Sequence, residues 1–167
     1  MGLLSDAGIK RAMGAGLISI EPFDESSLTP NGYDLSIAEL MLPDTGVLVG
    51  EGHMDVPPMS RLAISTREFV RLSSGIAAQL WLRTKWARKG MLASFGKVDA
   101  GFQGTITIGA FYAGSTPLRL EVGDRVCQIC FEPMDRPAEA EYGKRSGTWQ
   151  GQRGITIEPP ANDPDRK

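Results

Sequence analysis

Short runs of hydrophobic residues, separated by Gly, Pro and Asp, recur along most of the chain. The runs lie at residues 18–20, 33–42, 46–49, 61–66, 77–82, 91–95, 104–112, 118–121 and 125–132. Runs of this length, with turn residues at this spacing, are typical of the strands of an all-β barrel or sandwich. Pro57-Pro58 and the Ser-Ser-Gly at residues 73–75 mark connections between strands. The pattern predicts a mainly β protein.

One helix is predicted before the first strand, over residues 5–17. Ser5 is suited to its N-terminus, because a serine hydroxyl can accept a hydrogen bond from a free backbone N–H group there. Apolar residues at helical spacing follow, and two glycines end the helix: these are Ile9, Ala12 and Met13, then Gly14 and Gly16. A further helical turn is expected at residues 86–89.

The C-terminal part of the chain has a different composition. From Pro133 onward it is polar and rich in glycine, so little there can build a core. We expect a β domain over residues 1–132, an arm over residues 133–157 and a disordered tail over residues 158–167. Within the arm, residues 142–154 combine basic and amide side chains with glycine, which is typical of a flexible lid that closes over a phosphate chain.

Composition and charge are those of an ordinary globular domain. The chain has 167 residues, 41% of them hydrophobic and 23% charged, which suits one domain with its own core. A formal net charge of −2 gives no general footprint for nucleic acid. No apolar run approaches the roughly 20 residues of a membrane span, and the N-terminus lacks the apolar core of a signal peptide. We expect a cytoplasmic protein with neither a nucleic-acid nor a membrane partner.

Cys127 and Cys130 form a C-x-x-C motif that we interpret as structural. They fall in a predicted strand, where residues three apart point to opposite faces. There is no second cysteine pair, and His53 is the only histidine, so a zinc site lacks ligands. A redox-active motif would stand at a helix N-terminus. The sequence offers no set of metal ligands.

Residues 82–104 carry the candidate chemistry. Arg83 and Arg88 precede a tight turn that contains Asp99, with Phe102 beside it. Guanidinium groups bind phosphate, a carboxylate can hold or activate water, and an aromatic ring offers a flat apolar face. Together these groups suit a nucleoside triphosphate.

Five segments, in order, resemble the dCTP deaminase/dUTPase superfamily, and within it the archaeal-type dUTPases. They are LSDAGIKRAM with SLTPNGYDL, RTKWARKG, KVDAGFQGTI, GDRVCQICF and EYGKRSGTWQGQRG. The resemblance implies a distorted jelly-roll or β-clip barrel that forms a homotrimer with active sites between subunits. It also implies a deoxyuridine or deoxycytidine triphosphate substrate, with Mg²⁺ carried mainly by its phosphates.

The resemblance assigns chemistry to Asp99, which would hold or activate the water that attacks the α-phosphate. The alternative is a carboxylate that only caps the turn before Gly101. Phe102 takes the position of an aromatic residue that packs under the deoxyribose and excludes a 2′-hydroxyl; the alternative is a core aromatic residue on a hairpin.

Four residues stand at positions of the family's phosphate-binding motif, and one of them departs from it. Arg83 and Arg88 take the positions of its two arginines, and Thr84 takes that of a serine that contacts phosphate or water. Lys85 replaces a second serine, and it either binds phosphate or points to solvent. The alternatives are an interface ion pair for Arg83 and a surface charge at a helix end for Arg88.

Other matches complete the expected substrate site. Gln128 lies on a strand beside it, where a buried amide needs a partner. Tyr142 and Gln152, with Lys144, match lid groups that touch the γ-phosphate. Thr148 stands where the deaminases have a lysine, which predicts a weaker grip of the lid on phosphate.

One departure separates hydrolysis from deamination. Deaminases of this family carry a proton-transferring glutamate at the position of Gly109, or of Ala110 if the register shifts by one. Neither residue transfers a proton, so the sequence favours dUTP hydrolysis over dCTP deamination. The family's base-reading asparagine is also missing near Tyr112 and Ala113, and Tyr112 could supply a ring or a hydroxyl instead. A roomier pocket would allow a modified pyrimidine, and the extreme alternative is a binding protein without activity.

Overall fold

The computed structural model describes residues 2–161. Its strands are β1 (Ile18–Glu21), β2 (Leu28–Thr29), β3 (Gly32–Leu42), β4 (Val47–Val49), β5 (His53–Val56), β6 (Ser60–Thr66), β7 (Phe69–Leu72), β8 (Ile76–Leu82), β9 (Met91–Ser94), β10 (Lys97–Val98), β11 (Gln103–Gly104), β12 (Thr107–Tyr112), β13 (Leu118–Glu121) and β14 (Arg125–Pro133). Its helices are α1 (Asp6–Gly14), the 3-10 turn η1 (Glu25–Ser27), α2 (Thr84–Ala87) and α3 (Tyr142–Arg145).

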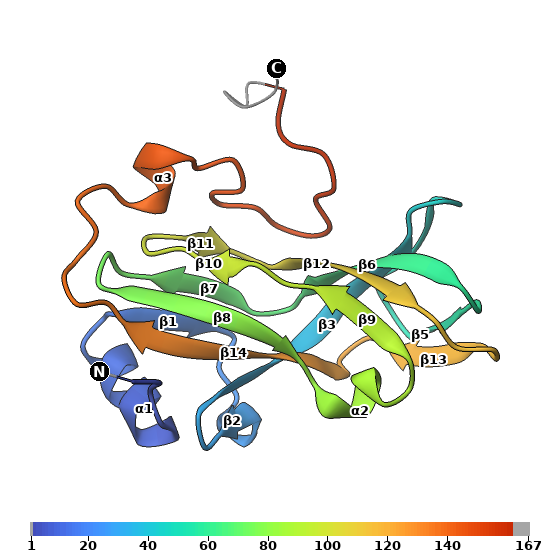
Figure 1. The fold of residues 1–167 in the computed structure, drawn as a ribbon, viewed down its shortest axis with the longest axis horizontal. Helices are drawn as coiled ribbons and strands as arrows, with labels where there is room; N and C mark the ends of the chain where they lie inside the picture. The colour runs from blue at the N-terminus through green and yellow to red at the C-terminus, as the bar shows by residue number, and fades with distance from the viewer. Residues whose placement is uncertain (1, 162–167) are drawn as a thin grey trace.

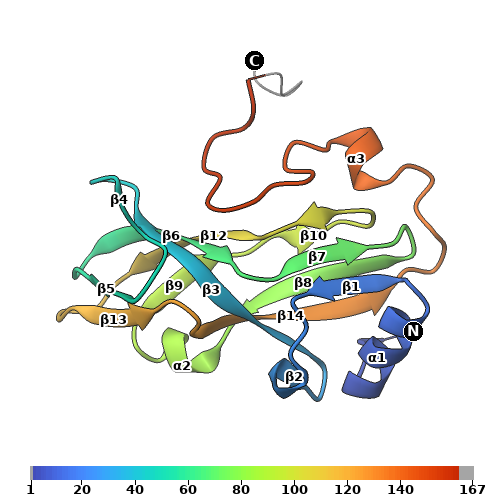
Figure 2. The same ribbon diagram turned by 180° about the vertical axis from the view of Figure 1, so that it is seen from behind.

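Antiparallel sheets curl around one hydrophobic core (Figures 1 and 2). In the described residues the largest sheet has the order β10-β8-β14-β3-β6-β12-β9, with β2 and β4 added against β3. Two smaller sheets have the orders β1-β7-β11 and β13-β5. The predicted mainly β, barrel-like class is confirmed.

The short N-terminal helix is also confirmed. The Ser5 hydroxyl caps α1 by accepting a hydrogen bond from the Gly8 N–H group at 3.2 Å. Ile9 and Ala12 are buried against the core. Gly16, just past the helix, has a φ of 70°, a conformation that glycine adopts without strain. No helix in the described residues is long and apolar enough to cross a membrane.

The structure supports a structural role for the two cysteines. Both are free thiols, buried in β14, and burial raises the pKa of each. No group of three or more potential metal-binding side chains occurs within residues 2–161. Buried thiols of raised pKa are poor nucleophiles and poor metal ligands, so Cys127 and Cys130 act here as small apolar side chains.

The arm (residues 133–157) turns back over the domain. In Figures 1 and 2 it lies on the side of β11 and β12, opposite α1 and α2. Tyr142 and Trp149 of the arm are partly buried and pack against the core. Residues 162–167 of the predicted tail lie outside the described residues.

Candidate active site

Three residues of the predicted phosphate motif, Arg83, Thr84 and Lys85, line one groove of about 680 Å³, here named the Arg83 groove. Its lining includes Asp34, Arg83, Thr84, Lys85 and Gln128, from β3, the start of α2 and β14. Two strands and a helix start that are distant in sequence therefore bring four of the predicted site residues together.

Arg83 already has a carboxylate partner in this groove. Its Nε atom lies 3.2 Å from Oδ2 of Asp34, whose side chain is only 4% exposed while that of Arg83 is 37% exposed. Burial raises the pKa of Asp34, and the positive charges of Arg83 and Arg125 oppose that shift. The guanidinium thus neutralises a buried carboxylate and still presents part of its surface to the groove.

The remaining motif residues differ in their surroundings. Lys85 Nζ lies 3.6 Å from Oδ1 of Asp124 and 4.2 Å from the centroid of the Trp86 ring. Arg88 is exposed at the C-terminal cap of α2 and lies outside the lining of the Arg83 groove. Gln128 donates to Thr29 Oγ1 at 2.6 Å, which supplies the partner that a partly buried amide needs.

Asp99 lies in a neighbouring groove of about 450 Å³, here named the Asp99 groove, which Lys97, Tyr142 and Arg145 also line. Glu132 lines both grooves. Within residues 2–161, no hydrogen bond or ion pair joins Asp99 to the residues of the phosphate motif. In a single chain the carboxylate and the arginines do not form one constellation. β10 pairs with β8 at Gln79 and Ala78, so Asp99 lies near the start of β8, whereas Arg83 follows its end.

Phe102 is buried beside the Asp99 turn. Its ring packs edge-on against Tyr142, with centroids 5.7 Å apart. Gly101 has a φ of 85°, and a side chain on Gly104 would approach Phe102 Cζ to 2.9 Å. The turn therefore needs both glycines, and in the single chain Phe102 is a core residue.

The arm closes against β11 and β12 through hydrogen bonds. Gln152 donates from Nε2 to the Thr105 carbonyl at 2.7 Å, and its own carbonyl accepts from the Thr105 N–H group at 3.0 Å. The Tyr142 hydroxyl accepts from the Trp149 N–H group at 3.0 Å. Arg153 lies over the Phe69 ring, 4.4 Å from its centroid. The residues that were predicted to form a lid are thus held by contacts within their own chain.

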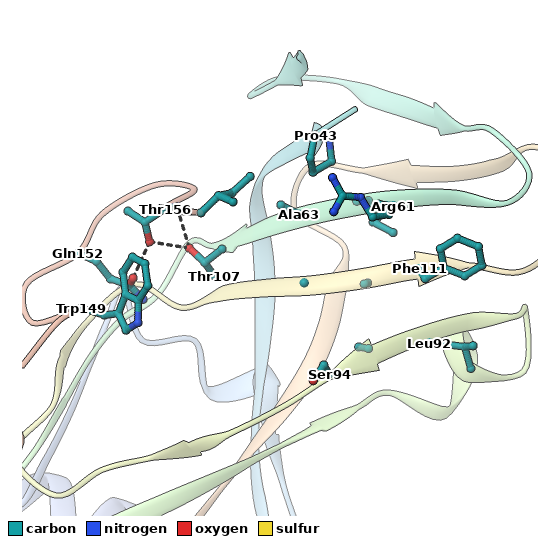
Figure 3. A pocket seen from close by; sticks show the side chains of 15 residues that line it. Pro43, Arg61, Ala63, Leu92, Ser94, Thr107, Phe111, Trp149, Gln152 and Thr156 are labelled. Atoms are coloured by element: carbon teal, nitrogen blue, oxygen red, sulfur yellow. Dashed lines mark hydrogen bonds between the residues drawn. The ribbon is translucent and has the colours of Figure 1, made fainter. Parts of the chain in front are cut away.

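A third groove of about 900 Å³, here named the Gly109 groove, runs over the outer face of β6, β12 and β9 (Figure 3). Gly109 and Ala110 both line it. Trp149, Gln152 and Thr156 of the arm stand at one end, and Phe111 and Leu92 stand at the other. Gly109, the position at which the resemblance expects the deaminases' glutamate, therefore lies in the floor of a groove that the arm closes at one end.

Tyr112 does not line this groove, so the idea that it adds a ring or a hydroxyl there was wrong. It is 4% exposed, and its hydroxyl donates to the Thr116 carbonyl at 2.7 Å. Since side chains alternate along a strand, Phe111 faces the groove and Tyr112 faces the core.

The sequence did not predict most of the residues that line the Gly109 groove. Ala63 on β6 and Ser94 on β9 flank Gly109 on either side in the strand register. Nothing in the sequence signals this, because the three positions are far apart and only the pairing of the strands aligns them.

Comparisons with known proteins agree with this fold. A family model described as dCTP deaminase-like matches residues 44–134. The dCTP deaminase of Thermococcus gammatolerans is 36% identical over 142 residues, covering 84% of this chain and 88% of the relative. A probable deoxyuridine 5'-triphosphate nucleotidohydrolase of Sulfolobus islandicus rod-shaped virus 1 is 32% identical over 158 residues, covering 93% of this chain and 97% of that one.

The crystal structure of the 2'-deoxycytidine 5'-triphosphate deaminase from Agrobacterium tumefaciens superposes with a TM-score of 0.65 at 16% identity. The match covers 79% of this chain and 48% of the other, so the chain spans about half the length of that protein. The fold is therefore that of nucleotide-processing enzymes built from curled antiparallel sheets. The chain belongs to the dCTP deaminase/dUTPase superfamily.

Proposed function

We propose that this chain is a dUTP diphosphatase, which hydrolyses dUTP to dUMP and pyrophosphate. The observation that carries the proposal is the lining of the Gly109 groove. Among its lining residues Arg61 alone is ionisable, and Arg61 forms two hydrogen bonds to Asp44, at 2.7 and 3.1 Å, from Nη2 and Nε. A groove with no carboxylate in its lining has no group there to carry a proton to a leaving ammonia.

Hydrolysis needs no proton carrier at the base, because its chemistry takes place at the phosphate. The oxygen of a water molecule forms a bond to the α-phosphorus, and the bond from that phosphorus to the oxygen bridging to the β-phosphorus breaks. Asp99 is our candidate for the group that orients this water and takes its proton. Its place at the rim of a groove, on a turn fixed by two glycines, supports this role.

The other residues bind the substrate in this proposal. Arg83, Thr84 and Arg88 contact the phosphates, and Lys85 adds a positive charge nearby. Phe102 shapes the contact with the deoxyribose, and Gln128 binds the substrate from its strand beside the site. In the arm, Tyr142 and Gln152 reach the triphosphate when the arm exchanges its present contacts for contacts with the substrate.

We propose that the complete site forms between copies of the chain in a homotrimer. The neighbouring but unconnected Arg83 and Asp99 grooves support this, since a second copy would bring one set of groups to the other. Magnesium enters only with the substrate phosphates, because the described residues contain no cluster of ligands that would hold it.

Product analysis by chromatography tests the proposal. Purified protein would be incubated with Mg²⁺ and, separately, dUTP, dCTP, dTTP and UTP. We expect dUMP and pyrophosphate from dUTP and no deaminated product from dCTP. Release of ammonia from dCTP would instead establish the deaminase activity for which several relatives are named.

The Asp99→Asn variant tests the assigned base. We expect turnover to fall by roughly 10²-fold or more, the usual range for removal of a general base, with little change in nucleotide binding. Asp135→Asn, at another exposed position of the chain, serves as the control. Unchanged turnover in Asp99→Asn would show that the carboxylate only caps its turn.

A further inference from the structure

Gly109 leaves an open space in the floor of the Gly109 groove, although the backbone conformation at this position does not require glycine. Its φ lies outside the left-handed region that favours glycine, and among the described residues a Cβ atom built there meets nothing within 4 Å. Gly101 and Gly104 differ, because positive φ and close contacts require glycine at both. The absence of a side chain at residue 109 is therefore better explained by what the groove holds than by folding.

The neighbours of Gly109 extend this open floor. Ala63 and Ser94 flank it across the two adjacent strands, and Ala110 and Ala93 also line the groove. The two positions that pair with Gly109 across the neighbouring strands thus carry side chains no larger than serine. The groove volume of about 900 Å³ lies near the upper end of the range for small-molecule sites, roughly 300–1,000 Å³.

The walls of the groove are apolar, and its polar groups are mostly neutral. Leu92 is 60% exposed and Ile157 is 47% exposed, although both are large apolar residues. Phe111 and Trp149 add aromatic surface at opposite ends (Figure 3). The hydroxyl groups of Ser94, Thr107 and Thr156 are polar without charge, and those of Thr107 and Thr156 donate to groups of the arm. Such a lining suits a neutral heterocycle that carries apolar surface.

We propose that the Gly109 groove binds the base of the nucleotide and selects a pyrimidine that bears an apolar ring substituent. This inference rests on the proposed function, because relatives named for dCTP and dUTP make the base a pyrimidine. An unsubstituted uracil leaves the space above Gly109 to water, whereas an apolar group placed there removes apolar surface from water and gains affinity.

Calorimetric titration tests this without depending on turnover. The ligands are the non-hydrolysable α,β-imido analogues of dUTP, 5-propynyl-dUTP and dATP, each with Mg²⁺. We expect the propynyl compound to bind at least as tightly as the dUTP analogue. Gly109→Leu, which fills the space, should weaken binding of the propynyl compound by roughly tenfold or more and binding of the dUTP analogue much less.

Gly50→Leu is the matched control, because Gly50 is also exposed, lies outside the groove and has open space at its Cβ position. Ser94→Leu fills the same groove from β9, and it replaces Gly109→Leu if that variant fails to fold. The control should bind all three ligands as the original chain does.

The outcomes separate the two proposals. Any of three results would overturn the inference. The propynyl analogue could bind the original chain tenfold more weakly than the dUTP analogue does, or the dATP analogue could bind as tightly as the propynyl analogue. The third such result is that Gly109→Leu and the original chain discriminate equally between the propynyl and dUTP analogues. None of these results affects dUTP hydrolysis, measured in parallel. If the propynyl compound binds as expected but neither dUTP nor 5-propynyl-dUTP is hydrolysed, the inference holds and the diphosphatase proposal fails.

Discussion

Arg83 stabilises the fold as well as facing a groove, because it neutralises the buried carboxylate of Asp34. Arg83→Ala leaves that carboxylate without its ion-pair partner. We expect the free energy of unfolding to fall by roughly 1–3 kcal/mol, which is less than for a fully buried pair because Arg83 is partly exposed. Urea unfolding at neutral pH measures this loss.

The double variant Asp34→Asn, Arg83→Ala is the control for this prediction. It removes the buried charge together with its partner, so it should be more stable than Arg83→Ala alone. If the two variants are equally unstable, the loss comes from packing of the arginine and the ion pair contributes little.

Glu68 predicts a pH dependence of stability. The residue is 4% exposed and accepts hydrogen bonds from the Ser36 N–H and hydroxyl groups, and burial raises its pKa. A raised folded-state pKa means that the folded protein holds the proton more tightly. Its contribution to stability is therefore complete below the unfolded pKa of about 4.3 and is lost as pH rises through the folded pKa.

The Glu68→Gln variant should lack this pH-dependent contribution to stability. We expect its urea midpoint, relative to that of the original chain, to improve as pH rises from about 4 to 7. Glu139→Gln, at an exposed position, controls for a general effect of losing one carboxylate. A constant difference between Glu68→Gln and the original chain across this range would contradict the argument.

At the scale of elements, the sequence predicted most strands because their apolar runs end at turn residues. β2, β5, β7 and β10 were not predicted. β2 and β10 have only two residues each. β5 and β7 have four each, and β5 alternates exposed and buried positions around a histidine and an aspartate that hide the pattern. β7 is buried at three of its four positions because β1 and β11 pair with it on either side, which its sequence alone does not reveal.

One hydroxyl of β12 contributes two hydrogen bonds to the backbone of the arm. Thr107 donates from Oγ1 to the Gly154 carbonyl at 3.2 Å and accepts from the Thr156 N–H group at 3.1 Å. Thr107→Val preserves shape and removes both bonds. We expect amide hydrogen exchange at residues 150–156 to rise by roughly tenfold, as for two hydrogen bonds of about 1 kcal/mol lost in part.

Thr116→Val, at an exposed position outside the arm contacts, should leave this exchange unchanged. If the arm also serves as the lid, Thr107→Val should raise KM for dUTP more than it lowers kcat. Faster exchange with an unchanged KM would separate docking of the arm from substrate binding.

At the scale of the molecule, the sequence indicated the individual site residues better than their arrangement. Asp99, Arg83 and Gly109 each stand on a recognisable motif, yet they line three different grooves of one chain. Motifs are local in sequence, whereas the distances between them depend on strand pairing and on any contact between subunits. The sequence could therefore name candidates but could not show which chain supplies each one.

Mixing two inactive variants decides whether a site is shared between chains. Asp99→Asn and Arg88→Ala each remove one proposed group, and both residues are exposed, so neither change should unfold the 18.0 kDa chain. If each site takes Asp99 from one copy and Arg88 from another, random assembly of equal amounts leaves roughly a quarter of the sites intact. Co-refolded mixtures should then regain about that share of the original activity.

The oligomeric state must agree with this result. Light scattering should give three chains per particle for the original protein and for both variants. A mixture no more active than the average of the separate variants would place Asp99 and Arg88 in the same subunit's site. A monomer with full activity would exclude the shared site altogether, and the Arg83 and Asp99 grooves would then have to act together across Glu132, the residue that lines both.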